Sequence, residues 1–232
     1  MNTLSINRNQ LKYLVIIAMV MDHVAWAFFP LESVEGQIFH FIGRLTGPTM
    51  AFFIYEGYIH TRNVKKYAMR LGIFAVISWV PFSLFESGHV EASFGVIYTL
   101  FLGLIAIWIW DKYDAPEGRK YLITFGLCIA SILGDWPMFD VLWPLCLFLY
   151  RDDEKGKWKR YWGIGLLAVI CSSPLEAPFW QNTYNLGIFV PIFLLQHCYS
   201  GERGSGHPFH KWFFYVFYPL HLVILWYIKY II

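Results

Sequence analysis

The sequence predicts an all-α integral membrane protein with about nine transmembrane helices in a single bundle and a cytoplasmic N-terminus. The chain is 57% hydrophobic, 20% aromatic and only 15% charged, which is too little charge for a soluble domain of this length. Nine apolar stretches run along it, and all but two of its 18 lysines and arginines lie at or near every second boundary between them. Short loops rich in lysine and arginine stay in the cytoplasm, so this alternation gives each stretch a direction.

Each apolar stretch is predicted to be a helix, because backbone polar groups in a bilayer must be satisfied internally and the stretches lack the two-residue alternation of a β-barrel. Some of the four stretches between residues 121 and 196 need not span fully, because they are short for a hydrocarbon core of about 30 Å. We expect residues 1–232 to form a single polytopic transmembrane domain, since no linker interrupts them. Starting outward and alternating in direction, the predicted spans are residues 11–29, 38–60, 69–85, 94–110, 121–133, 137–150, 158–171, 186–196 and 211–231.

The connecting loops divide by charge. The basic residues gather in loops predicted to be cytoplasmic, among them residues 62–70 and the mixed-charge segment 151–160, which is predicted to be a solvated loop. Charges spread in this way fit anionic lipid headgroups better than nucleic acid, so no nucleic-acid partner is expected. The four cysteines have no metal-like spacing, and no metal is expected. The loops predicted to face outward contain no lysine or arginine: residues 31–37, 87–93, 134–136 and 172–182.

Five ionisable residues are predicted to lie inside the membrane: Asp22, His23, Arg44, Asp140 and His221. A rise of about 1.5 Å per residue puts most of them in the outer half of the bilayer. Such residues are costly there and usually face the bundle interior. Arg44 could form a structural ion pair with Asp22 or Asp140. Alternatively, the cluster is a catalytic or ligand site, which the two histidines favour because imidazole can move a proton near neutral pH.

Glycine and proline residues accompany this cluster. Gly43 and Gly47 flank Arg44, so a neighbouring backbone can approach closely there. Pro48 and Pro219 each remove a helix hydrogen bond and favour a kink. Ordinary helix packing is the alternative explanation, since both residue types are common in membrane helices.

A second group of charges lies near the cytoplasmic end of the stretch 38–60. Glu56 is followed there by Arg62, Lys65, Lys66 and Arg70. These bases can simply fix the topology. They can also bind an anionic cytoplasmic ligand, because clustered lysines and arginines recognise phosphates.

Three strings of residues carry a resemblance to a known family: LKYLVIIAMVMDHV (11–24), IGRLTGPTMAFFIYEGYIHTRNVKKYAMRLGIFAVIS (42–78) and FYVFYPLHLVIL (214–225). Their Asp-His pair, Gly-Arg-x-x-x-Pro stretch, Glu-Gly with Thr-Arg, and Tyr-Pro-x-His resemble the TraX family. That family is named for the conjugative-plasmid membrane protein that acetylates the N-terminus of pilin. Residues 94–205 carry no motif that we can place.

The resemblance implies an acetyltransferase in the bacterial cytoplasmic (inner) membrane that uses acetyl-CoA as the acyl donor. The cytoplasmic bases would then bind the acetyl-CoA headgroup. The acceptor would be an amine or hydroxyl of a peptide, a glycan or a lipid, reached from the outer side or from the bilayer. This arrangement agrees with the predicted depth of the ionisable residues.

Within that reading, the catalytic residues are expected to be His23, Asp22, Arg44, His221 and Tyr218. His23 would be the base, oriented by Asp22 or another nearby carboxylate. Arg44 would stabilise negative charge on the thioester carbonyl. Tyr218 and His221 are three residues apart, so they share a helical face and would line the same cavity.

Two other classes of function fit the same residues. A secondary transporter or proton-coupled permease also needs buried histidine, aspartate and arginine. The odd number of spans and the lack of an internal repeat count against it. A non-enzymatic membrane scaffold is the third possibility, and it predicts that changes at His23 and Arg44 affect assembly but no chemistry.

Overall fold

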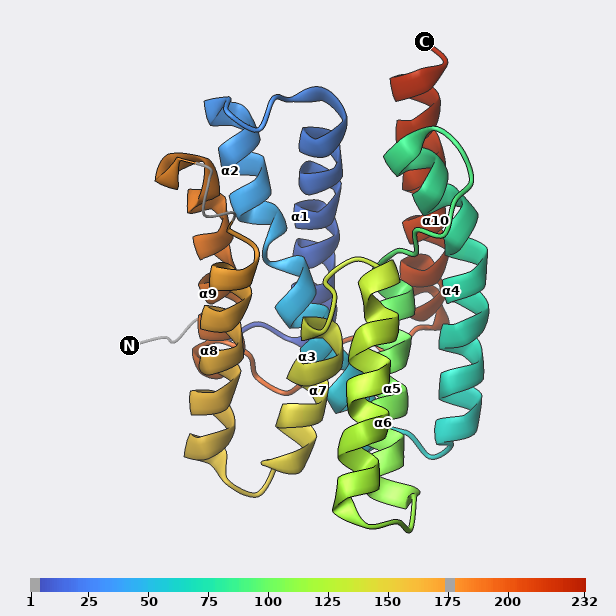
Figure 1. Cartoon of the computed structure of the whole chain (residues 1–232), viewed down its shortest axis with the longest axis vertical. Coiled ribbons are helices and arrows are strands. Elements are labelled where there is room, and N and C mark those ends of the chain that lie inside the picture. Colours follow the sequence, from blue (N-terminus) through green and yellow to red (C-terminus); the bar gives the residue numbers. More distant parts are fainter. Residues whose placement is uncertain (1–4, 174–177) are drawn as a thin grey trace. The chain divides into compact units, whose positions relative to one another are not determined.

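The computed structural model describes residues 5–173 and 178–232. Most of these residues lie in helices (Figure 1). Their remaining parts form loops and two isolated bridges, which confirms the predicted all-α class. The first six elements are α1 (Arg8–Phe28), α2 (Val34–Gly43), α3 (Thr46–His60), α4 (Val64–Ser87), α5 (Val96–Lys112) and α6 (Glu117–Ala130). The others are η1 (Ser131–Leu133), α7 (Phe139–Leu149), α8 (Glu154–Cys171), η2 (Phe179–Ile188), α9 (Phe189–His197) and α10 (Pro208–Tyr230).

Three helices of the described chain are long and apolar enough to cross a membrane, judged by length and composition. They are α1, α4 and α10, and α7 is a shorter apolar helix. A helix needs about 20 apolar residues to cross the hydrocarbon core. The predicted count of nine spans, the cytoplasmic N-terminus and the single domain stay predictions.

The predicted span 38–60 is formed by two helices, and the kink expected at Pro48 takes the form of a break. The helix is interrupted at Arg44 and Leu45, which separate α2 from α3. Pro48 gives the physical reason, because inside a continuous helix its ring would clash with the carbonyl of Arg44 and its missing N–H would leave that carbonyl unbonded. With the interruption, Pro48 falls in the first turn of α3, where no helical N–H is needed.

Four segments predicted to be loops are partly helical. Helix α2 begins inside the predicted loop 31–37, and α4 begins inside the predicted loop 62–70. Helix α8 begins at Glu154, inside the predicted solvated loop 151–160. The Asp153 carboxylate accepts a hydrogen bond from the Gly156 N–H and so caps this helix. A hydrogen bond from Lys157 lowers the pKa of Glu154, and Trp158 also donates to that carboxylate. Charges predicted to be solvated therefore stabilise the first turns of a helix.

The predicted outer loop 172–182 is also shorter than expected, because η2 begins at Phe179. Residues 174–177 of this loop lie outside the described residues. The predicted span 186–196 corresponds to the end of η2 together with α9.

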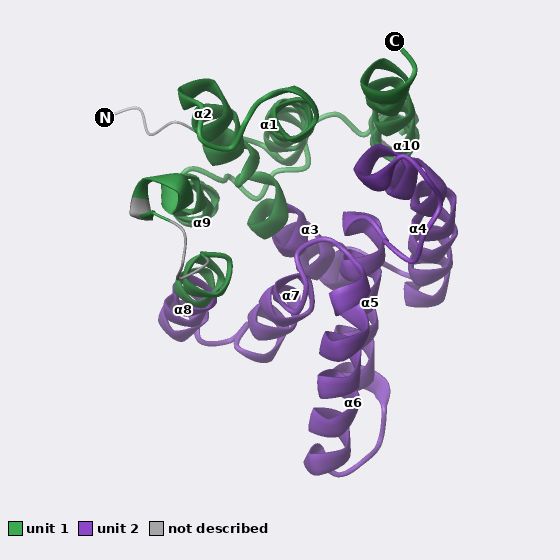
Figure 2. Cartoon of the chain, turned by 45° about the horizontal axis from the view of Figure 1, so that its top comes forward, with its two compact units in different colours: residues 1–49, 165–232 green, residues 50–164 purple. Residues whose placement is uncertain are grey.

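The chain divides into two compact units (Figure 2). The first contains residues 1–49 and 165–232. Within it, α1 packs against α2 and α10, and α2 packs against η2. The second contains residues 50–164, and within it α5 packs against α4, α6 and α7. Leu102, Ala106, Cys128, Val141 and Leu145 form an apolar cluster between α5, α6 and α7.

Candidate functional site

The Asp22 carboxylate on α1 holds two basic groups from the neighbouring helix. His40 Nδ1 lies 2.7 Å from Asp22 Oδ1, and Arg44 Nη2 lies 3.5 Å from Asp22 Oδ2. His40 is on α2, and Arg44 follows its last residue. A cation at the C-terminal end of a helix also interacts favourably with the helix dipole. The sequence left Asp22 and Asp140 open as partners of Arg44, and the structure pairs it with Asp22. We call Asp22, His40 and Arg44 the Asp22 network.

Glycine residues allow the three segments of this region to come together. A Cβ atom at Gly43 would overlap the Asp22 side chain. A Cβ atom at Gly187 on η2 would overlap the Phe41 carbonyl oxygen and press on Arg44. Residues with side chains at these two positions would push α2 away from α1 and η2, so glycine is what makes the Asp22 network possible here.

Aromatic rings surround the basic groups of the Asp22 network. The His40 ring centroid lies 4.3 Å from that of Trp26 and 5.3 Å from that of Tyr184. The Arg44 guanidinium lies 5.1 Å from the Tyr184 ring centroid, within the range of a cation–π interaction. The side chains of His40 and Arg44 are 1% and 12% exposed. Arg44 is therefore held inside this unit of the protein.

A second pair of polar side chains joins α1 to α10. His23 Nδ1 lies 2.9 Å from His221 Nε2, and His221 Nδ1 lies 3.0 Å from the Phe217 carbonyl oxygen. That carbonyl can only accept, so His221 Nδ1 carries the hydrogen. In a neutral His221 the Nε2 atom then accepts, and His23 Nδ1 donates to it. Because Asp22 and His23 are consecutive on α1, the two sets of contacts adjoin.

Tyr218 lies close to this histidine pair and is buried. Its ring centroid is 5.6 Å from that of His221, in an edge-on arrangement. The Phe217 ring stacks on His221 with centroids 5.3 Å apart. The structure thus brings Asp22, His23, Arg44, Tyr218 and His221 into one unit, and their roles in catalysis stay predictions.

His40 was not among the site residues predicted from the sequence. It lies four residues before Arg44, and residues with this spacing share a helical face. This spacing could have identified His40 as a neighbour of Arg44, because both residues lie before the break at Pro48 and so belong to the same helix end.

Asp140 belongs to the second unit and has different partners. It is fully buried in the first turn of α7, and Thr99 on α5 lies 2.9 Å from its Oδ2 atom. Among the described residues, its Oδ1 atom has no hydrogen-bond partner. The structure gives Asp140 no part in the Asp22 network.

The residues predicted to bind acetyl-CoA lie around the start of α4. The Asn63 side chain caps this helix by accepting a hydrogen bond of 2.9 Å from the Lys66 N–H. Lys65 and Lys66 are exposed, as is Arg62 just before the cap. Half-buried Arg70 lies over the Tyr67 ring at 5.3 Å, whereas Glu56 is buried on α3. Three of the five predicted side chains are therefore accessible, and they lie at a helix N-terminus, which favours anions.

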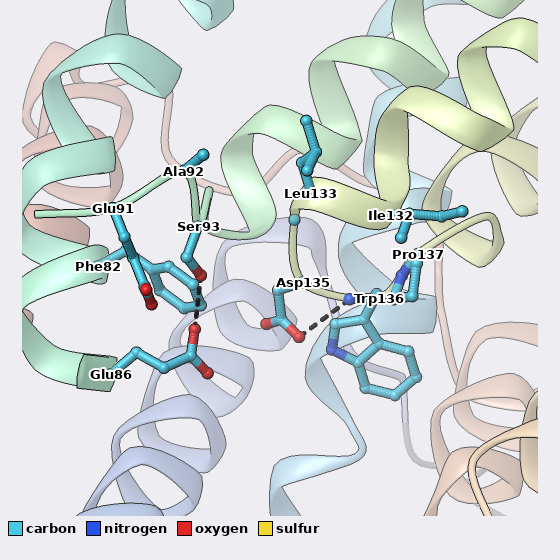
Figure 3. Close-up of a pocket in the computed structure, with 11 residues that line it drawn as sticks. Phe82, Glu86, Glu91, Ala92, Ser93, Ile132, Leu133, Asp135, Trp136 and Pro137 are labelled. Atoms are coloured by element: carbon cyan, nitrogen blue, oxygen red, sulfur yellow. Dashed lines mark hydrogen bonds between the residues drawn. The ribbon is translucent and has the colours of Figure 1, made fainter.

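The described part of the chain also contains a cavity of about 540 Å³ in the second unit (Figure 3). Glu86, Glu91 and Asp135 line it together with Phe82 and Trp136. The Glu86 carboxylate accepts a hydrogen bond of 2.7 Å from the Ser93 hydroxyl at its edge. None of the predicted site residues lines this cavity. Its residues come from three separated segments, and no sequence pattern predicted that these segments meet.

Two comparisons with known proteins each cover more than nine tenths of the chain. The family model described as "TraX protein" matches residues 7–229. A protein of Dichelobacter nodosus named "Probable fimbrial assembly protein FimC, serogroup H1" is 33% identical over 230 residues, and the match covers 93% of each chain. No solved structure matches the chain.

Proposed function

The chain belongs to the TraX family, and on that premise we propose that it is a membrane-embedded acyltransferase. It moves an acetyl group from cytoplasmic acetyl-CoA to an acceptor amine or hydroxyl that arrives from the outer side or from the lipid. The observation that supports this most is the Asp22 network, in which a half-buried carboxylate fixes both an imidazole and a guanidinium. A structural ion pair would require only Arg44 and Asp22.

The chemistry of acyl transfer matches the groups present. The acceptor nitrogen or oxygen attacks the thioester carbonyl, and a base removes its proton. Negative charge develops on the carbonyl oxygen, and the Arg44 guanidinium is a fixed positive charge that can stabilise it in a water-poor site. His23 is the base that the sequence predicts, and His221 is hydrogen-bonded to it.

The related protein of Dichelobacter nodosus is named for fimbrial assembly. An amine at the N-terminus of a pilin-like peptide is therefore the acceptor to test first. An α-ammonium group has a reference pKa of about 7.7–8.0, so it needs only modest help to lose its proton.

The donor and the acceptor are proposed to reach the protein from opposite sides. Arg62, Lys65, Lys66 and Arg70 would bind the phosphates of acetyl-CoA on the cytoplasmic side, because guanidinium and ammonium groups recognise phosphate oxygens. The protein would be a multi-pass component of the bacterial cytoplasmic membrane, with these bases inside.

Cysteine labelling tests this orientation. In a background with Cys171→Ser and Cys198→Ser, a membrane-impermeant maleimide should label His89→Cys in intact cells. It should label Lys66→Cys only after the cells are opened. Labelling of Lys66→Cys from outside would overturn the proposed topology.

An assay in proteoliposomes tests the activity. Purified protein is given acetyl-CoA with a labelled acetyl group and a synthetic peptide with a free N-terminal alanine. The proposal expects label on the peptide amine and release of free CoA. Proton flux without consumption of acetyl-CoA would instead identify the transporter class.

A further inference from the structure

We propose that His40 is the general base of the transfer reaction and that Asp22 is its positioning residue. This assignment rests on the proposed acyltransferase function, and it replaces His23 as the predicted base. Three features of His40 support this role: its carboxylate partner, its buried second nitrogen, and its place beside Arg44.

The carboxylate partner fixes the tautomer of His40. Asp22 Oδ1 lies 2.7 Å from Nδ1 and can only accept, so Nδ1 carries the hydrogen. In the neutral ring Nε2 then has a free lone pair. When Nε2 takes up a proton, the positive ring remains bonded to a negative carboxylate at short range, which stabilises the protonated form. A histidine held in this way is suited to accept a proton from a substrate.

The second nitrogen of this ring is buried and has no hydrogen-bond partner among the described residues. His40 is 1% exposed, so bulk water does not supply the missing bond. A buried polar atom without a partner costs about 1–3 kcal/mol. A substrate N–H or O–H group would provide the bond that the protein does not, and the position of Nε2 is therefore suited to the acceptor.

His23 has a different environment. Its Nδ1 atom is bonded to His221 Nε2 at 2.9 Å. A neutral imidazole stabilises a protonated histidine less than a carboxylate does. The hydrogen bond and the ion pair of Asp22 go to His40 and Arg44. We therefore assign His23 and His221 to positioning α1 against α10, next to the reacting groups.

Arg44 completes the arrangement around His40. The two residues are one helical turn apart and bind different oxygens of the same carboxylate. Tyr184 lies against both, with centroid distances of 5.3 Å to the His40 ring and 5.1 Å to the Arg44 guanidinium. The group that accepts the proton and the group that stabilises the carbonyl oxygen are thus fixed by the same partners. Among the described residues, the charged and titratable groups that contact the His40 ring or its partners are Asp22, Arg44 and Tyr184, with His23 adjoining on α1.

The reaction step balances with these groups alone. The acceptor nitrogen forms a bond to the acetyl carbonyl carbon, and His40 Nε2 takes the proton that the nitrogen loses. The bond from that carbon to the CoA sulfur then breaks. The thiolate leaves with the electron pair and receives the proton from His40, which restores the neutral ring.

The test uses the full-length protein in proteoliposomes with acetyl-CoA and the alanyl peptide. His40→Gln should lower kcat by about 10²–10⁴-fold, the usual contribution of a general base. His23→Gln should lower it less, and His89→Gln, at an exposed site in a predicted outer loop, should leave it unchanged. Thermal unfolding and size-exclusion chromatography of each variant show whether the fold is kept.

A second acceptor separates a base from a structural residue. A peptide hydrazide has a less basic amine that loses its proton more readily, so it should recover part of the activity lost in His40→Gln. A structural role predicts equal losses with both acceptors. That equality, or wild-type activity in His40→Gln, would overturn the assignment of His40. If the wild-type protein transfers no acetyl group at all, the proposed function and this assignment both fail.

A measurement on the wild-type protein covers the case in which His40→Gln does not fold. Diethyl pyrocarbonate modifies a histidine nitrogen that has a free lone pair, and it can reach the buried Nε2 of His40 only by the path that admits the acceptor. Mass spectrometry locates the modified residue. Inactivation should follow modification of His40 and should be slowed by the alanyl peptide. Inactivation that follows His23 while His40 stays unmodified would contradict the proposal.

Discussion

Asp22 and Asp140 are two aspartates in apolar helices, and their surroundings differ sharply. Asp22 contacts a guanidinium and an imidazole, and its side chain keeps 16% exposure. Asp140 is fully buried and contacts a neutral hydroxyl. A buried carboxylate is stable as an anion only with charged or several hydrogen-bonding partners. The predicted depth therefore does not distinguish the two aspartates, whereas the kind of partner does.

Hydrogen-bond geometry supports this difference. The Thr99 hydroxyl lies 3.0 Å from the Val96 carbonyl oxygen and 2.9 Å from Asp140 Oδ2. A hydroxyl has one hydrogen, so it cannot donate to both. If Asp140 is a neutral acid, it donates to Thr99, and Thr99 donates to Val96. We expect Asp22 to be ionised and to position His40 and Arg44, and Asp140 to be neutral and structural.

The largest effect is expected for Asp22→Asn. This change removes the negative partner of Arg44 and of His40, and a carboxamide can hold the His40 ring in the wrong tautomer. Acetyl transfer should fall by about 10²–10⁴-fold. Breaking a buried ion pair costs up to about 3–5 kcal/mol of stability. The Asp22 and Arg44 side chains are partly exposed, so we expect a loss of about 3 kcal/mol or less.

Transfer kinetics and urea unfolding in detergent measure the two effects of Asp22→Asn. The matched control is Asp114→Asn, at an exposed site outside the Asp22 network, which should change neither quantity. Wild-type turnover in Asp22→Asn would remove the distinction between the two aspartates.

Arg44 should show the next largest effect. Arg44→Lys keeps the charge beside Asp22 but loses the planar group that can bind two partners at once. It should unfold at higher urea concentration than Arg44→Ala and still lose roughly 10²–10³-fold in kcat, as when one charge-stabilising donor is removed. Equal kinetics for Arg44→Lys and wild type would leave Arg44 as an ion-pair partner only.

The comparison also shows what the sequence could predict. Apolar length is a local property, and the predicted spans 69–85 and 211–231 correspond to α4 and α10. A kink at Pro48 was predicted but a full break was not, because a proline kinks or interrupts a helix according to what its neighbours can bond. Here the end of α2 is fixed against α1, because Arg44 pairs with Asp22 and Gly43 lies in close contact with the Asp22 side chain.

The site, like the fold, could be predicted only in part. Asp22, Arg44 and His221 stand out in the sequence because ionisable groups are rare in apolar helices. Whether Arg44 pairs with Asp22 or Asp140 depends on which helices pack together, and a single sequence does not contain that information. His40 was overlooked because it lies near the predicted outer surface, where a histidine needs no special explanation.

A glycine substitution tests the close packing that assembles the Asp22 network. Gly43→Ala adds a methyl group that overlaps the Asp22 side chain, so α1 and α2 must move apart. We expect a loss of about 1–3 kcal/mol in the free energy of unfolding, as for other overpacked sites. The control is Gly126→Ala on α6, where no atom lies within 4 Å of the added group. It should raise helix stability by up to about 1 kcal/mol. A neutral Gly43→Ala would show that this contact is loose.

The smallest effect is expected for Asp140→Asn. A neutral Asp140 donates one hydrogen bond to Thr99, and an asparagine of nearly the same shape can donate the same bond through its amide nitrogen. The free energy of unfolding should therefore change by only about 1 kcal/mol, the net value of one neutral hydrogen bond. Acetyl transfer by the folded variant should equal that of wild type, in contrast to Asp22→Asn. If Asp140→Asn stays folded but loses transfer, Asp140 takes part in the reaction, and the choice between the two aspartates by their partners is wrong.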